Sequence, residues 1–64
     1  MELNGVVRRV RGEFLEMPGL RLTPAQARRL WDLESELCRE VIDALVAEAF
    51  LRWTDSGAVT RLEA

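Results

Sequence analysis

Two prolines, Pro18 and Pro24, decide where the first two helices of this chain can lie. A proline lacks the backbone N–H that a helix interior needs, and it biases the preceding residue away from the helical region. Pro18-Gly19 is therefore a turn that ends any helix before it. Thr23-Pro24 indicates the start of a helix, because a hydroxyl cap is followed by proline at the first helical position. Between them, segment 20–22 alternates like a short strand.

Segment 2–17 has the apolar periodicity of one helix. Its apolar residues are separated by alternating steps of four and three, and Val6 and Leu15 widen the stripe. The stripe comprises Leu3, Val7, Val10, Phe14 and Met17.

The second predicted helix runs from 24 to about 31. We expect Ala27, Leu30 and Trp31 to face inward. The apolar positions before and after segment 32–34 do not fit the spacing of one continuous helix. A tight turn is therefore predicted there.

The third predicted helix begins near Glu34 or Ser35 and has the widest apolar face of the chain. After this helix, the spacing of the apolar residues is no longer helical. Segments 50–54 and 58–62 read as two strands, and 55–57 as a three-residue turn with glycine, which together predict a hairpin. The apolar face of the third helix comprises Leu37, Cys38, Val41, Ile42, Leu45, Val46 and Ala49.

The length of 64 residues allows one domain, which we expect to span 1–64. Hydrophobic residues make up 48% and charged residues 31%, a globular balance. No apolar run approaches the roughly 20 residues that cross a bilayer, and the first residues do not resemble a signal peptide. The sequence therefore predicts a cytoplasmic protein with no membrane partner.

The side-chain inventory disfavours catalysis. The chain has no His, Tyr or Lys, which removes the usual groups for acid-base chemistry and metal ligation. Cys38 is the single cysteine and is expected to act as a small hydrophobic residue. Glu36, Glu40 and Asp43 share one helix face, which is expected to be solvated rather than to bind a metal. We predict no enzyme activity, no cofactor and no small-molecule substrate.

The most distinctive stretch runs from Met17 to Leu30 and continues at Leu33, Cys38, Val41, Leu45, Val46, Phe50 and Leu51. These residues resemble the winged helix-turn-helix domains of bacterial transcription regulators, in their small single-domain form. The resemblance implies a mainly α fold with a small β-hairpin wing: three helices, a short strand that pairs with the wing, and the hairpin. It also implies that the third helix enters the DNA major groove and that the wing contacts the backbone or minor groove.

One position departs from the pattern of that family. Such sequences usually have glycine where this chain has Ala49, because the residue after the third helix often adopts a left-handed conformation. That conformation costs a non-glycine residue about 1 kcal/mol, so the turn either keeps its form with strain or takes another shape.

The second helix offers candidate phosphate contacts. Its start carries Thr23 and Gln26, and its exposed side carries Arg28 and Arg29. Backbone N–H groups and short polar side chains at a helix start bind phosphate. The alternative is that Arg28 pairs with Asp32 four residues on.

The third helix offers candidate base contacts at Ser35, Glu36, Arg39 and Glu40. Arginine is the commonest bidentate reader of guanine, and carboxylates accept from cytosine. Alternatively, Arg39 pairs with Asp43 or Glu36 and only decorates the surface.

The wing carries Arg52 and Arg61, which are placed to reach the DNA backbone or minor groove. Arg52 has an alternative partner in Glu48. We expect Trp31 and Trp53 to be core and wing anchors rather than platforms on which bases stack; if Trp53 is exposed on the wing, it marks a contact surface.

Double-stranded DNA is thus the first predicted partner, for a transcriptional regulator or a component of a nucleoprotein complex. The alternative is a protein-protein interaction module with a winged-helix fold that does not bind DNA. The net charge of −2 and the acidic third helix favour that alternative. A homodimer formed through the first helix is a further possibility.

Overall fold

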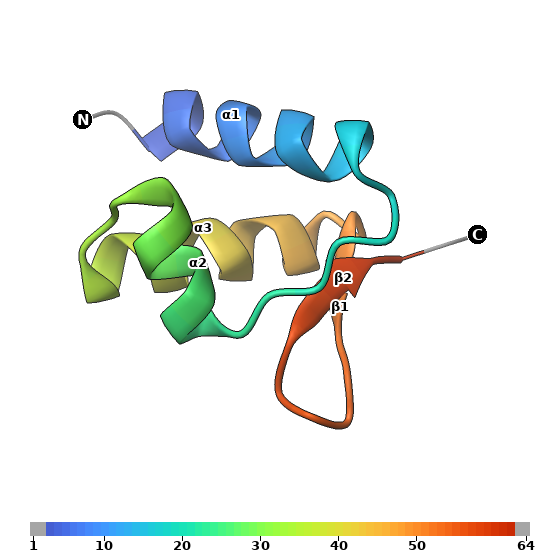
Figure 1. Cartoon of the computed structure of the whole chain (residues 1–64). Coiled ribbons are helices and arrows are strands. Elements are labelled where there is room, and N and C mark those ends of the chain that lie inside the picture. The colour runs from blue at the N-terminus through green and yellow to red at the C-terminus, as the bar shows by residue number, and fades with distance from the viewer. Residues whose placement is uncertain (1–2, 63–64) are drawn as a thin grey trace.

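Three helices followed by an antiparallel hairpin make up residues 3–62, the part of the chain that the computed structural model describes (Figure 1). The arrangement is the mainly helical layout of a winged helix, as the sequence predicts. Glu2, the expected first residue of the first helix, lies outside the described residues. The elements are α1 (Leu3–Glu16), α2 (Pro24–Trp31), α3 (Ser35–Ala47), β1 (Leu51–Trp53) and β2 (Val59–Arg61).

The start of α2 is fixed by a reciprocal cap between Thr23 and Gln26. The Gln26 backbone N–H donates to the Thr23 hydroxyl at 3.2 Å, and the Thr23 backbone N–H donates to Gln26 Oε1 at 2.9 Å. With Pro24 at the first helical position, this capping box satisfies donors that a helix start leaves open.

The predicted turn between α2 and α3 is confirmed. Asp32 has a left-handed backbone with φ of 53°, which lets the Leu33 N–H donate to the Arg28 carbonyl at 3.1 Å. Aspartate tolerates this region better than most residues. The chain then enters α3 at Ser35, so the two helices join through three residues.

In the hairpin, β1 pairs with β2 in the register Leu51↔Arg61, Arg52↔Thr60 and Trp53↔Val59. Because strand side chains alternate between faces, Trp53 lies on the face of Leu51, and Arg52 lies on the other face. Trp53 and Arg52 therefore lie on opposite sides of the hairpin.

The predicted strand at 20–22 is reduced to a single bridge between Leu22 and Val59. Their backbone N–H groups and carbonyls exchange hydrogen bonds of 3.1 and 2.7 Å. The Thr60 hydroxyl adds a 2.9 Å bond to the Leu20 carbonyl. The connection from α1 to α2 is thereby attached to the hairpin, as the winged-helix layout implies.

The core lies between α1 and α3, and α2 and the hairpin close its ends (Figure 1). Phe14 of α1 and Trp31 of α2 meet edge to face, with ring centroids 6.0 Å apart. The most deeply buried large side chains are Phe14, Ile42, Leu45, Leu51, Val10, Val41, Val59 and Cys38. None of the helices within residues 3–62 has the length and apolar character needed to span a bilayer.

Three apolar residues expected on the inward faces are instead exposed. Leu30 is 53% exposed, because it lies about 100° around α2 from Trp31, outside the narrow buried stripe of that short helix. Leu15 of α1 is 53% exposed for the same reason relative to Phe14. Met17, 46% exposed, follows the end of α1 and therefore leaves the helical stripe.

Candidate nucleic-acid interface

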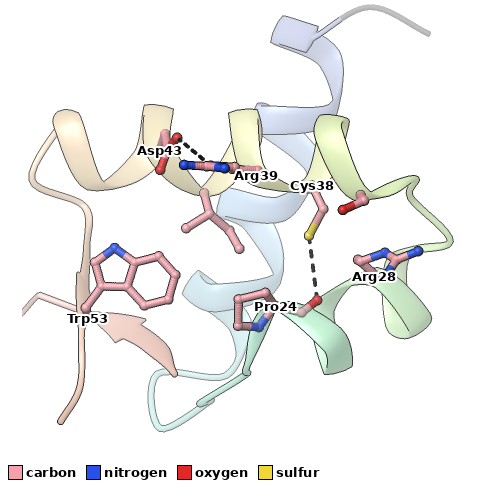
Figure 2. Close-up of a pocket in the computed structure, with 8 residues that line it drawn as sticks. Pro24, Arg28, Cys38, Arg39, Asp43 and Trp53 are labelled. Carbon is pink, nitrogen blue, oxygen red and sulfur yellow. Dashed lines mark hydrogen bonds and ion pairs between the residues drawn. The ribbon is translucent and has the colours of Figure 1, made fainter. Parts of the chain in front are cut away.

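A groove of about 500 Å³ lies where α2, α3 and the hairpin meet (Figure 2). We call it the Trp53 groove. Its walls come from Pro24 and Arg28 of α2, from Trp53 at the end of β1, and from one side of α3. The residues of α3 that line it are Ser35, Cys38, Arg39, Ile42 and Asp43.

The spacing of these α3 residues explains the polar rim and the apolar floor. Ser35, Arg39 and Asp43 are separated by four residues each, so they form one exposed row along the helix. Cys38 and Ile42 precede Arg39 and Asp43 by one position, which turns them toward the core, and both are buried. The groove therefore has an apolar floor beneath a row of polar side chains.

The two arginines of the groove lie in different surroundings. Arg39 Nε is 3.9 Å from Asp43 Oδ2, and these side chains are 85% and 63% exposed, so the pair is weak. This pairing is the alternative that the sequence left open for Arg39. Arg28 occupies the last turn of α2, where its positive charge interacts favourably with the negative end of the helix dipole. Two arginines against one carboxylate leave the groove with one net positive charge.

Cys38 keeps the floor uncharged. Its thiol is free and buried, and Sγ lies 3.8 Å from the Pro24 carbonyl oxygen. Burial raises the pKa of the Cys38 thiol above its ordinary value of 9.0, while the Arg28 guanidinium lowers it by a smaller amount. The thiol is consequently neutral at physiological pH. Within residues 3–62, no cluster of three or more acidic or cysteine side chains is placed to hold a metal ion.

Trp53 is the exposed aromatic residue of the groove. Its side chain is 45% exposed, and Figure 2 shows the indole ring at one end of the groove with Arg28 at the other. Pro24 lies between them, across from Arg39 and Asp43 on α3. Trp53 is therefore exposed on the hairpin rather than packed as a buried anchor.

The groove brings together Arg28, Ser35 and Arg39 of the predicted DNA contacts. Glu36 and Glu40 are exposed on α3 but do not line it. Glu36 and Glu40 share a helix face with Asp43, and of these three carboxylates only that of Asp43 lines the groove.

Other predicted contacts of α2 lie outside the groove. Thr23 and Gln26 form the capping box at the start of α2 and do not line the groove. Arg29 lines a second hollow, together with Ala25, Arg28, Asp32 and Leu33. No ion pair between Arg28 and Asp32 is present in the described part of the chain.

The two predicted hairpin contacts also lie apart from the groove. Arg52 is exposed on the face opposite Trp53. Arg61 lies over the Phe50 ring, 5.1 Å from its centroid, where a second guanidinium from Arg11 lies at 5.6 Å. Arg11 also forms a salt bridge with Glu48, which therefore has a partner other than the expected Arg52.

The predicted list of contacts omitted Pro24, Cys38, Ile42, Asp43 and Trp53. Helical spacing from Ser35 and Arg39 is a signal that points to the α3 members of this group. Pro24 and Trp53 reach the groove only through the docking of α2 and the hairpin against α3.

No family model, curated protein or solved structure matches this chain. The assignment of the site therefore depends on its own geometry and charge.

Proposed function

We propose that this chain binds DNA, as a transcriptional regulator or as a component of a nucleoprotein complex. The supporting observation is that Arg28, Arg39 and Trp53 meet in one groove beside α3, the helix that lies in the major groove in a winged-helix layout. In this proposal, Arg28 contacts phosphate, Ser35 and Arg39 contact bases, and the hairpin lies against the neighbouring backbone.

The charges of α3 set how DNA approaches it. Glu36 and Glu40 repel phosphates, whereas the guanidinium groups of Arg28 and Arg39 attract them. DNA that contacts α3 along the groove keeps its backbone near the two arginines, and the two glutamates do not line that surface. DNA in this orientation makes a small number of phosphate contacts, so its binding is modest and depends on salt.

The direct test is a fluorescence-anisotropy titration of a labelled duplex at about 50 mM and about 200 mM salt. The proposal predicts binding that weakens as salt rises. The double variant Arg28→Ala/Arg39→Ala should lose most of the affinity, and Arg8→Ala/Arg9→Ala, which removes the same charge from the exposed side of α1, is the matched control. The absence of binding at low salt by the folded protein would refute the proposal.

A second candidate is a protein-interaction module, which the exposed carboxylates of Glu36 and Glu40 favour. A basic partner surface would complement this side of α3. The charge reversal Glu36→Arg/Glu40→Arg should then abolish capture of the partner and increase affinity for DNA. Capture that is unchanged by the reversal would count against this function.

A further inference from the structure

Trp53 carries a feature that phosphate contacts do not explain. Its indole is 45% exposed at the end of a groove whose floor is formed by Cys38 and Ile42. By contrast, the other tryptophan, Trp31, is 2% exposed and packs in the core against Phe14. The hairpin therefore exposes a large aromatic surface to solvent in a groove that is also lined by two arginines.

An aromatic face beside cations is the combination that binds unpaired nucleotides. Bases stack on the ring, and a positively charged groove follows the backbone. In Figure 2, Arg28 and Trp53 lie at opposite ends of the groove, with Arg39 along one wall. The volume of about 500 Å³ lies within the range of sites that enclose small ligands.

A continuous B-form duplex cannot make all of the contacts that this groove offers. Its bases are stacked on one another, so their faces are closed to Trp53, and only edges and phosphates reach the protein. The cations that attract phosphate, Arg28 and Arg39, line the groove, whereas Glu36 and Glu40 are exposed on α3 and do not line it. A single strand that leaves the duplex presents both a base face and an accessible phosphate to the groove.

We infer that the Trp53 groove binds an unpaired nucleotide of DNA, with its base stacked on Trp53 and its phosphate held by Arg28 and Arg39. This inference rests on the proposed DNA binding and names the form of DNA that the site takes: a duplex with a single-stranded extension. The Arg39–Asp43 pair does not block it, because a contact of 3.9 Å between exposed groups releases the guanidinium at little cost.

The test compares two DNA probes at equal salt: a blunt duplex and the same duplex extended by a few unpaired thymidines. We expect the extended duplex to bind about tenfold more tightly, which is the range of one stacked base. Binding of the extended probe should also quench tryptophan fluorescence. Because Trp31 is 2% exposed, that quenching reports on Trp53.

Variants of the protein test whether the preference for the extended probe and the quenching depend on Trp53. Trp53→Ala should remove both the preference for the extended probe and the quenching, and Trp53→Phe should retain part of the preference. Leu15→Ala is the control, since Leu15 is 53% exposed on α1 and does not line the groove. Circular dichroism establishes that each variant is folded, and the comparison of probes on the unmodified protein requires no variant.

The outcomes separate this inference from the proposed function. Equal affinity for both probes without quenching would overturn the nucleotide site and leave DNA binding in place. Failure of both probes to bind at low salt would overturn both. Tighter binding of the extended probe that persists in Trp53→Ala would overturn the assignment to Trp53.

Discussion

The backbone N–H of Phe50 donates a 3.0 Å hydrogen bond to the carbonyl oxygen of Leu45 and thereby closes the C-terminus of α3. This closure places Ala49 in the left-handed region, with φ of 62°, and directs the chain into β1. The Ala49 N–H also donates to the Val46 carbonyl at 3.0 Å, which completes a Schellman motif. The connection between α3 and the hairpin thus carries local backbone strain.

Replacing Ala49 with glycine should relieve that strain. We expect Ala49→Gly to raise the free energy of unfolding by about 1 kcal/mol, because glycine adopts a positive φ without steric cost. Chemical denaturation followed by circular dichroism measures the change. The matched control is Ala47→Gly in the last turn of α3, which should lower stability by about 0.5–1 kcal/mol. A loss of stability in Ala49→Gly would contradict the role of this position.

Asp43 is expected to limit the affinity of the groove for DNA. The variant Asp43→Asn removes the negative charge beside Arg39 at nearly constant shape, so DNA affinity should rise several-fold at low salt. Asp55→Asn, which makes the same change in charge at the exposed hairpin turn, is the control and should have a smaller effect. Anisotropy titrations of the two variants provide the comparison. An equal rise in both would show that only net charge matters.

The Thr60 hydroxyl should contribute to the attachment of the α1–α2 connection to the hairpin. Thr60 is buried and donates to the Leu20 carbonyl at 2.9 Å. Thr60→Val keeps the shape and removes the donor, so we expect a loss of about 1 kcal/mol in the free energy of unfolding. Thr60→Ser retains the hydroxyl and serves as the comparison in the same denaturation experiment. A larger loss in the serine variant would contradict a role for the hydrogen bond.

Alkaline stability should report on a single side chain, Cys38. The chain contains no Lys or Tyr, and arginine stays charged, so Cys38 is the side chain that titrates at alkaline pH. Burial raises the pKa of Cys38 in the folded state above its ordinary value of 9.0, and the folded protein therefore holds this proton more tightly than the unfolded chain. The contribution of this tighter proton binding to the free energy of unfolding is fully present below the ordinary pKa of 9.0 and is lost as the pH rises through the folded-state pKa.

We therefore expect the free energy of unfolding to fall as the pH is raised above 9.0. Denaturation curves over a series of pH values measure the fall. The variant Cys38→Ala should show a flatter profile over the same range, whatever its stability at neutral pH. Identical slopes in the two proteins would rule out the titration of Cys38 as the cause.

Local signals in the sequence were sufficient for most of the fold. Pro18 and the Thr23-Pro24 pair act within a few residues of themselves, so the end of α1 and the start of α2 follow from local backbone chemistry. The sequence left open whether the turn at Ala49 keeps a left-handed residue, and the structure shows that it does. The same local reasoning placed Leu30 inward, which was wrong, because the width of a buried stripe depends on how closely neighbouring elements pack.

The groove was harder to predict than the helices. Arg28 and Arg39 were chosen for their charge and helix position, and both line it. Trp53 joins them only because β1 docks against α3 with the face that carries Leu51, which turns Trp53 to the side of α3 and Arg52 to the other side. Such a meeting depends on long-range docking of β1 against α3, and residue spacing within one element does not encode it.

The central claim is that the Trp53 groove is the DNA-contact surface, and chemical-shift mapping of the isotope-labelled protein during titration with DNA tests it most directly. We expect the largest shifts at the backbone amides of Arg28, Ser35 and Arg39 and at the indole N–H of Trp53. Shifts confined to the exposed side of α1, around Arg8 and Arg9, with an unperturbed groove would contradict it.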